Sequence, residues 1–325
     1  MTSIKKMNIK IISTIILSVL TILSCSKDND TITKSDCTSD IVKDTSVGSC
    51  NETLTFSHQY NETISGTTRT ITANSIPEHM VGLFGKVQGS LNPNAISEQN
   101  ETYNITTTPS VATLLTPLLS TTGNIHNIGP QYSFGILFSG VELDPIPAEP
   151  FPHNGILDPN VNWEWNLEAL NVNIGLDCNY AHVQPQGKYH YHGKPTLFLD
   201  NLGVPTDTMT LIGYAADGFP IYYKYAYTDA NDNTSAVIEM TSSYQLKTGE
   251  RPGDGITAPC DTYNGVYSND YEYIDGLGKL DEANGRTGVT PEYPSGTYYY
   301  IITDNFPSIP RYFRGTPSQD FKIGQ

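Results

Sequence analysis

The sequence predicts a mainly β fold, either a sandwich or an irregular barrel with long loops and at most one or two short helices. Thr, Tyr, Ile and Val are abundant, and 27 Gly and 21 Pro interrupt the chain, which is typical of short strands joined by turns. Amphipathic helical periodicity is nearly absent. No linker rich in Gly, Ser or Pro and no fixed-period repeat divides residues 51–325, so we expect them to form one domain.

Strands are predicted where β-branched and aromatic residues cluster between turn residues. The predicted strands cover residues 67–73, 133–141, 188–192, 211–214, 221–227 and 296–303. One segment, Trp163–Val172, has apolar residues at helical spacing, namely Trp163, Leu167 and Leu170. It predicts one or two helical turns.

Residues 1–24 have the features of a secretory signal peptide. Three Lys residues precede an apolar run from Ile11 to Leu23 that only Ser and Thr interrupt. The run is too short for a permanent membrane-spanning helix and matches the apolar region of a signal peptide. Because these Lys residues are the only charged residues in the segment, its removal changes the formal net charge from −16 to −19.

The predicted signal peptide ends at Ile22-Leu23-Ser24-Cys25, which resembles a bacterial lipobox. The resemblance implies that Cys25 carries a diacylglycerol and so has outer-membrane lipid as its partner. The alternative is a simple secretory signal followed by a chance Cys. Residues 26–30, Ser-Lys-Asp-Asn-Asp, resemble the export signal of surface lipoproteins in Bacteroidetes-type bacteria. We therefore expect a lipid-anchored protein of the outer membrane, exposed on the cell surface.

Residues 25–50 are rich in Ser, Thr, Asp and Lys and contain hardly any apolar residues. Such a segment cannot bury enough surface to offset its chain entropy, so we predict a flexible tether. The acidic charge of the mature chain argues against nucleic acid as a partner, because binding phosphates requires Lys and Arg. No segment after the signal peptide is long and apolar enough to cross a membrane.

Four cysteines remain once Cys25 is acylated: Cys37, Cys50, Cys178 and Cys260. An even number in an oxidising compartment predicts disulfides. Of the three possible pairings we favour Cys178 with Cys260, because both lie in the part of the sequence richest in motifs. Cys37 with Cys50 would then close a loop within the tether. No C-x-x-C spacing indicates a zinc site at these cysteines.

Residues 187–193, Gly-Lys-Tyr-His-Tyr-His-Gly, contain two of the seven histidines of the chain. In a strand, His190 and His192 share one face, about 6.5–7 Å apart at a rise of about 3.3 Å per residue, and the tyrosines share the other. His182 lies eight residues before His190, and the turn-rich loop between them could bring it back. Three imidazoles predict a site suited to zinc or copper rather than calcium.

A plainer interpretation is also open, in which these histidines only hydrogen-bond neighbouring loops. Asp217 lies in an Asp-Gly turn that needs such a residue for backbone reasons, but it could equally orient an imidazole of the site. His126 and His153 are isolated and are interpreted as structural or solvated. On the strand interpretation, the two tyrosines are buried with paired O–H groups, and the histidines face a cleft bordered by the turn at residues 215–219.

Residues 175–193 (GLDCNYAHVQPQGKYHYHG) resemble the signature of the YHYH-domain proteins. Residues 212–222 (IGYAADGFPIY), 270–273 (DYEY) and 276–286 (GLGKLDEANGR) fit the same family, and the resemblance extends over residues 91–316. It implies a secreted or lipid-anchored β-rich domain of a kind found widely in bacteria. It does not bring an activity with it.

Three positions depart from the pattern of that family. Ala283 and Tyr312 stand where relatives often carry cysteines. Their joint loss implies that those two cysteines pair with each other in relatives, which leaves Cys178 and Cys260 as partners here. Tyr299 stands where the second Tyr-His-Tyr of the family has its histidine. If that position holds a metal or a substrate in relatives, this chain has a weakened site or one that contains a phenol.

Three functions are compatible with these observations. The first is a polar site of His182, His190, His192 and Asp217 that holds a metal and is hydrolytic or redox-active; a hydrolytic metal would lower the pKa of a bound water. The second is a non-catalytic binding module, in which some of the 21 tyrosines form a platform for a glycan or a partner protein at the cell surface. The third is a structural envelope protein whose His and Tyr residues only hold the fold.

Overall fold

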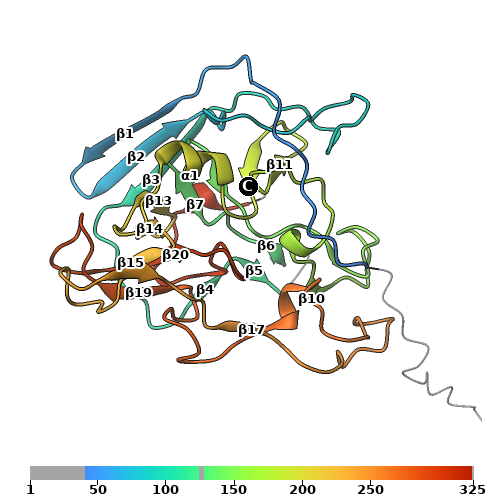
Figure 1. Cartoon of the computed structure of the whole chain (residues 1–325). Helices are drawn as coiled ribbons and strands as arrows, with labels where there is room; N and C mark the ends of the chain where they lie inside the picture. Colours follow the sequence, from blue (N-terminus) through green and yellow to red (C-terminus); the bar gives the residue numbers. More distant parts are fainter. Residues whose placement is uncertain (1–40, 124–127, 324–325) are drawn as a thin grey trace, which may run out of the picture.

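A mixed sheet of eight strands forms the centre of the protein (Figure 1). The computed structural model describes residues 41–123 and 128–323. The strands of the central sheet are β7 (Gly135–Leu137), β8 (Glu142–Leu143), β11 (Ala181–Val183), β12 (Tyr189–Tyr191), β13 (Leu211–Ala215), β14 (Pro220–Tyr223), β19 (Gly285–Gly288) and β20 (Thr297–Ile302). Their order is β11-β12-β8-β7-β13-β14-β20-β19, with β12–β8 and β14–β20 as its parallel pairs.

A three-stranded antiparallel sheet packs against the same core. It consists of β1 (Tyr60–Ser65), β2 (Thr68–Ala73) and β3 (Glu101–Thr106), of which β1 and β2 are blue in Figure 1. Burial alternates along β2 and β3, so that one face of this sheet packs and the other is exposed. The remaining strands form short pairs: β4 (Thr116–Pro117) with β21 (Tyr312–Phe313), β5 (Leu119–Ser120) with β6 (Gly129–Pro130), β9 (Pro150–Phe151) with β10 (Asn162–Asn166), β15 (Tyr225–Tyr227) with β16 (Val237–Glu239), and β17 (Tyr244–Leu246) with β18 (Tyr271–Tyr273).

The mainly β class is confirmed, and the sheets do not close into a barrel among the described residues. The sequence of strand β20 is almost continuously aromatic and aliphatic, and the packing of the strand explains this pattern. Tyr298, Tyr300 and Ile302 lie in the main core, whereas Tyr299 and Ile301 lie in a second core. Because side chains alternate along a strand, a strand with this pattern is buried on both faces.

Helix is scarce, as the sequence predicts. The single α-helix of the described residues, α1 (Thr196–Leu202), ends at Gly203, whose φ of 59° lies in the left-handed region that glycine favours at helix ends. Short 3-10 turns cover Ala169–Asn171, Ser268–Asp270 and Gln319–Phe321. In the described part of the chain, no helix has the length and apolar character needed to span a bilayer.

The one or two helical turns predicted in Trp163–Val172 are confirmed only in part. The first half of the segment is β10, and one 3-10 turn, Ala169–Asn171, follows it. Trp163 and Trp165 are both buried, at the spacing of two residues that a strand requires. The apolar residues of this segment therefore fit two periodicities, and tertiary packing selects the strand.

A flexible tether was predicted for residues 25–50, but residues 41–50 are bonded to the domain. The N–H of Asp44 donates to the carbonyl of Asn171 at 2.9 Å, and the N–H of Gly48 donates to the carbonyl of Leu176 at 2.8 Å. These bonds fix residues 41–50 on the domain, although their composition is that of a linker. Residues 1–40, with Cys25 and Cys37, lie outside the described residues.

A disulfide joins Cys50 to Cys178, with the Cα atoms 5.6 Å apart. The predicted pairings of Cys178 with Cys260 and of Cys37 with Cys50 are therefore wrong. Cys260 is disulfide-bonded as well. The physical reason is the docking of residues 41–50, because the bond between Gly48 and Leu176 brings Cys50 beside the loop that holds Cys178.

We expect this disulfide to be a major contributor to stability, since it closes a loop with a sequence separation of 128 residues. Replacing both cysteines (Cys50→Ala with Cys178→Ala) should lower the free energy of unfolding by about 3–5 kcal/mol, as measured by chemical denaturation. Peptide mapping of the non-reduced protein should recover a Cys50–Cys178 cross-link. A Cys178–Cys260 cross-link would contradict the structure.

Candidate metal centre

The hairpin of β11 and β12 places His182 directly opposite His190. The two strands pair antiparallel, with His182 and His190 as cross-strand partners. The loop between them turns at Gly187, whose φ of 93° disfavours any residue with a side chain, and a Cβ there would collide with Ser97. The predicted return of His182 is therefore confirmed, and glycine makes the turn possible.

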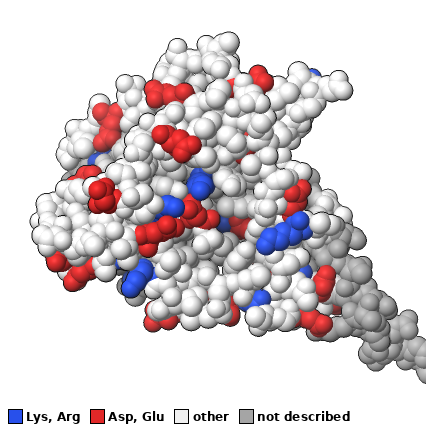
Figure 2. Space-filling model, in the orientation of Figure 1, with Lys and Arg blue, Asp and Glu red and all other residues white. Residues whose placement is uncertain are grey.

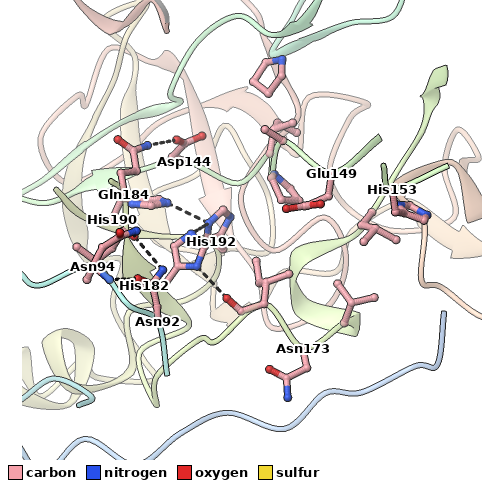
Figure 3. Close-up of a pocket in the computed structure, with 18 of the residues that line it drawn as sticks. Asn92, Asn94, Asp144, Glu149, His153, Asn173, His182, Gln184, His190 and His192 are labelled. Atoms are coloured by element: carbon pink, nitrogen blue, oxygen red, sulfur yellow. Dashed lines mark hydrogen bonds between the residues drawn. The ribbon is translucent and has the colours of Figure 1, made fainter. Parts of the chain in front are cut away.

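The three imidazoles converge through their Nε2 atoms, as Figure 3 shows. Nε2 of His192 lies 3.0 Å from Nε2 of His190 and 3.1 Å from Nε2 of His182. One ligand atom from each ring lies within 4.8 Å of the others. In a tetrahedral centre with bonds of about 2.0–2.1 Å, neighbouring ligand nitrogens are about 3.3 Å apart. The two distances from Nε2 of His192 are therefore a few tenths of an ångström shorter than that spacing.

Backbone carbonyls fix the orientation of two of these rings. Nδ1 of His182 lies 3.1 Å from the carbonyl of Ile174, and Nδ1 of His190 lies 3.3 Å from the carbonyl of Lys188. A carbonyl only accepts hydrogen bonds, so each Nδ1 carries the proton, and each Nε2 presents a lone pair. This is the tautomer of a histidine that binds metal through Nε2.

The lone pairs of the cluster outnumber the protons available to it. His192 lies between the other two rings, and its Nε2 can donate at most one hydrogen, so at least one of the two close pairs of nitrogens has no hydrogen bond. Nδ1 of His192 is buried without a hydrogen-bond partner among the described residues, although the backbone of Pro145 is near enough to raise the pKa of the ring. A cation at the point of convergence would satisfy all three Nε2 atoms at once.

Burial keeps the rings neutral. His190 and His192 are each 2% exposed, and desolvation followed by the charge of the neighbouring imidazoles holds the pKa of both well below the usual 6.5. Desolvation also lowers the pKa of the half-buried His182. Neutral imidazole is the form that binds a metal, so the site is ready for an ion at neutral pH.

The opposite face of β12 is the packed face, as predicted. Tyr189 and Tyr191 are fully buried in the main core. The O–H of Tyr189 donates to Oδ2 of Asp177 at 2.8 Å, and the O–H of Tyr191 lies 2.7 Å from Nε2 of His79. Both phenols are therefore paired. Sequence analysis assigned no role to His79, because its contact with Tyr191 spans 112 residues and has no local signal.

Asp217 does not belong to the histidine cluster, and the cleft is not bordered by the turn at residues 215–219. Its Oδ2 accepts hydrogen bonds from the O–H of Tyr300 at 2.5 Å and from the N–H of Gly315 at 2.8 Å. The turn connects β13 to β14, and β8 and β7 separate β13 from β12. Asp217 is thus a buried structural acid, and burial raises its pKa to about 6.

Tyr299 is equally remote from the cluster. It lies on β20, which four strands (β8, β7, β13 and β14) separate from β12, and it packs in the second core. Its O–H accepts a hydrogen bond from Nε of Arg286 at 2.6 Å. Sequence analysis suggested a weakened site, because Tyr299 replaces a histidine of the family. That site is not this cluster, whose three histidines are all present.

The histidines line a cavity of about 930 Å³. Its wall includes apolar side chains such as Ile146, Val172 and Ile174, and His153, which bonds the O–H of Tyr267 and lies apart from the cluster in Figure 3. Three acids that sequence analysis missed also line it, namely Asp44, Asp144 and Glu149. Burial, followed by the charge of Glu142, raises the pKa of Asp144 to about 7.

Truncating a packed tyrosine of β12 should cost far more stability than truncating a half-buried tyrosine of another strand. Tyr191→Ala should lower the free energy of unfolding by about 3–5 kcal/mol, because it empties a filled core position. The half-buried Tyr225 on β15 offers a control, and Tyr225→Ala should cost much less. Thermal or chemical denaturation measures both, and equal losses would show that β12 is not the packed strand described.

Comparison with known proteins supports the resemblance seen in the sequence. No curated protein and no solved structure matched the chain. The family model described as YHYH protein matches residues 102–315, which include the histidine hairpin and most of the central sheet. The match covers more than half of the 325 residues. The chain belongs to the YHYH protein family.

Proposed function

We propose that this protein binds one zinc or copper ion through Nε2 of His182, His190 and His192. The observation that carries the proposal is the convergence of the three Nε2 atoms, which have more lone pairs than protons. Imidazole nitrogen suits both metals, whereas calcium and magnesium prefer oxygen. Three protein ligands leave a further coordination place for water or a substrate.

The cavity could hold a substrate next to the open coordination place. It is large enough for a small molecule, and the three histidines that would hold the ion line it. A bound ion would polarise a substrate and lower the pKa of a bound water, which is the basis of hydrolysis. We therefore favour hydrolytic use of the centre over a purely structural one, with redox chemistry as the corresponding use if the ion is copper.

We also propose that the domain is displayed on the outer membrane by a lipid on Cys25. The lipobox-like segment and the acidic residues after it support this proposal. Acidic side chains are spread over the face shown in Figure 2, and the basic ones are scattered among them rather than gathered in one patch. That distribution gives no support to nucleic acid as a partner.

The alternative of an aromatic binding platform has less support. Every described tyrosine and tryptophan is buried or half-buried, and Phe56 is the one aromatic side chain among the exposed large hydrophobic residues. A glycan platform needs exposed rings on one face. The tyrosines serve the core instead, as Tyr189 and Tyr191 show.

Metal content tests the proposal. The purified domain, loaded with zinc or copper and dialysed, should retain one ion per chain by elemental analysis, and the double variant His190→Gln with His192→Gln should retain none. His153→Gln is the matched control, because His153 lines the same cavity outside the cluster. Equal metal in all three proteins, or negligible metal in the wild type, would contradict a three-histidine centre.

The pKa shifts predict an unusual pH dependence of metal affinity. Three imidazoles with an ordinary pKa of about 6.5 would lose roughly 50-fold in affinity between about pH 7.5 and about pH 6, because protons compete for each ring. Here all three pKa values are lowered, so competition should begin at a lower pH. Zinc affinity should therefore change much less over this range, as a competing chelator can measure. A full 50-fold loss would show that the rings titrate normally.

A further inference from the structure

One buried carboxylate in the cavity lacks a partner for one of its oxygens. Asp144 is 4% exposed and lines the cavity. Its Oδ2 accepts a hydrogen bond from Nε2 of Gln184 at 3.2 Å, whereas its Oδ1 has no hydrogen-bond partner among the described residues, although the backbone N–H of Ile146 is near enough to lower the pKa of the carboxyl. A buried carboxylate oxygen left unpaired is costly. Such an atom on a cavity wall indicates a hydrogen-bond donor that occupies the cavity.

The strand pairing places this carboxylate beside the histidines. β8 runs parallel to β12, with Glu142 aligned to His190, and the N–H of Asp144 donates to the carbonyl of Tyr191 at 2.8 Å. The next position along the pair aligns Asp144 with His192. Neighbouring strands lie about 4.8 Å apart, and residues two apart share a face. Figure 3 shows Asp144 next to the cluster, on the side of Gln184.

A comparison with Glu142 shows that Asp144 is not one more member of a structural ion pair. Oε1 of Glu142 accepts from Nζ of Lys188 at 2.8 Å and from the O–H of Tyr103 at 2.6 Å. Asp144 has no such cation within salt-bridge distance among the described residues. It also lies outside the group of ligand atoms that converge on the metal position. It is therefore not one of the ligands of that position.

We propose that Oδ1 of Asp144 accepts the proton of the water, or of an acidic ligand, held at the open place of the three-histidine centre. The inference rests on the proposed metal function and adds a proton acceptor to it. It accounts for the unpaired oxygen, because the bound molecule supplies the missing donor.

The proton balance is that of hydrolysis. Asp144 takes one proton from the bound water, and the remaining hydroxide attacks the carbonyl carbon of an ester or an amide. The acyl–oxygen or acyl–nitrogen bond then breaks, and Asp144 returns the proton to the departing alkoxide or amine. One water is consumed, and no oxidant or reductant is needed.

The cavity wall narrows the class of substrate. Asp44, Asp144 and Glu149 line it, and no Lys or Arg does so among the described residues. An anionic group such as a phosphate would lack a basic partner there. The apolar side chains of the wall favour an acyl compound with an apolar portion and no negative charge.

Benzohydroxamic acid is a suitable probe, because it is uncharged, has an apolar ring and gives up a proton when it binds a metal. Its affinity for the zinc-loaded protein is measured by calorimetry at a fixed, mildly alkaline pH. Asp144→Asn should keep the zinc but weaken the probe by about 10- to 100-fold, through loss of a charge-assisted hydrogen bond. Azide, which has no proton to give, should bind the variant as well as the wild type or better.

Glu149→Gln is the matched control, since it removes the charge of another cavity acid that is more exposed. It should leave the affinity for benzohydroxamic acid unchanged. Equal affinity in wild type and Asp144→Asn, or an equal loss in Glu149→Gln, overturns the role of Asp144 while the metal function stands. Loss of zinc from Asp144→Asn also overturns it, because Asp144 would then hold the ion. Absence of zinc from the wild type is a failure of the metal function itself, and elemental analysis identifies it separately.

Discussion

The antiparallel register that places His182 opposite His190 is the constraint on which the candidate site depends. Side chains alternate along a strand, so a slip of one residue would move His190 on β12, and His192 directly after it, to the packed face. The turn at Gly187 fixes the register from one end. The tyrosines fix the register from the packed face, because the O–H of Tyr189 bonds Asp177 and the O–H of Tyr191 bonds His79. The tyrosines of the motif thus determine where the histidines point.

That arrangement has an energetic cost that a ligand would remove. Burial disfavours the charged form of each imidazole, so protons cannot easily hold the cluster together. Buried polar atoms without partners cost about 1–3 kcal/mol each, and the cluster adjoins two of them, Nδ1 of His192 and Oδ1 of Asp144. An ion that binds only the folded state would offset part of this cost and stabilise the fold. A bound ion would therefore give the histidine nitrogens partners, as Asp177 and His79 already do for the tyrosine O–H groups.

The strands and the histidine cluster were predictable because their signals are local. Alternation within residues 188–192 and the eight-residue spacing to His182 are contained in one hairpin. Asp144 was not predictable, since only the parallel pairing of β8 with β12 brings it there from 46 positions before His190. The pairing of Cys50 with Cys178, at a sequence separation of 128, was not predicted for the same reason. Asp217 was misassigned because an Asp-Gly turn near a strand does not reveal which strands lie between it and the histidines.

The position of the hairpin in the sheet explains how a buried cluster can exchange a ligand. β11 is one of the two edge strands of the central sheet, and β12 is its only neighbour in that sheet. His182 on the edge is half-buried, whereas His190 and His192 are fully buried. An ion or a substrate would therefore approach past His182 and the cavity wall, while the inner pair stays fixed by packing. Tyr299 lies on β20, beside the opposite edge strand β19, but its side chain is fully buried in the second core. At the β11 edge, by contrast, the half-buried His182 lets the site be both preorganised and open.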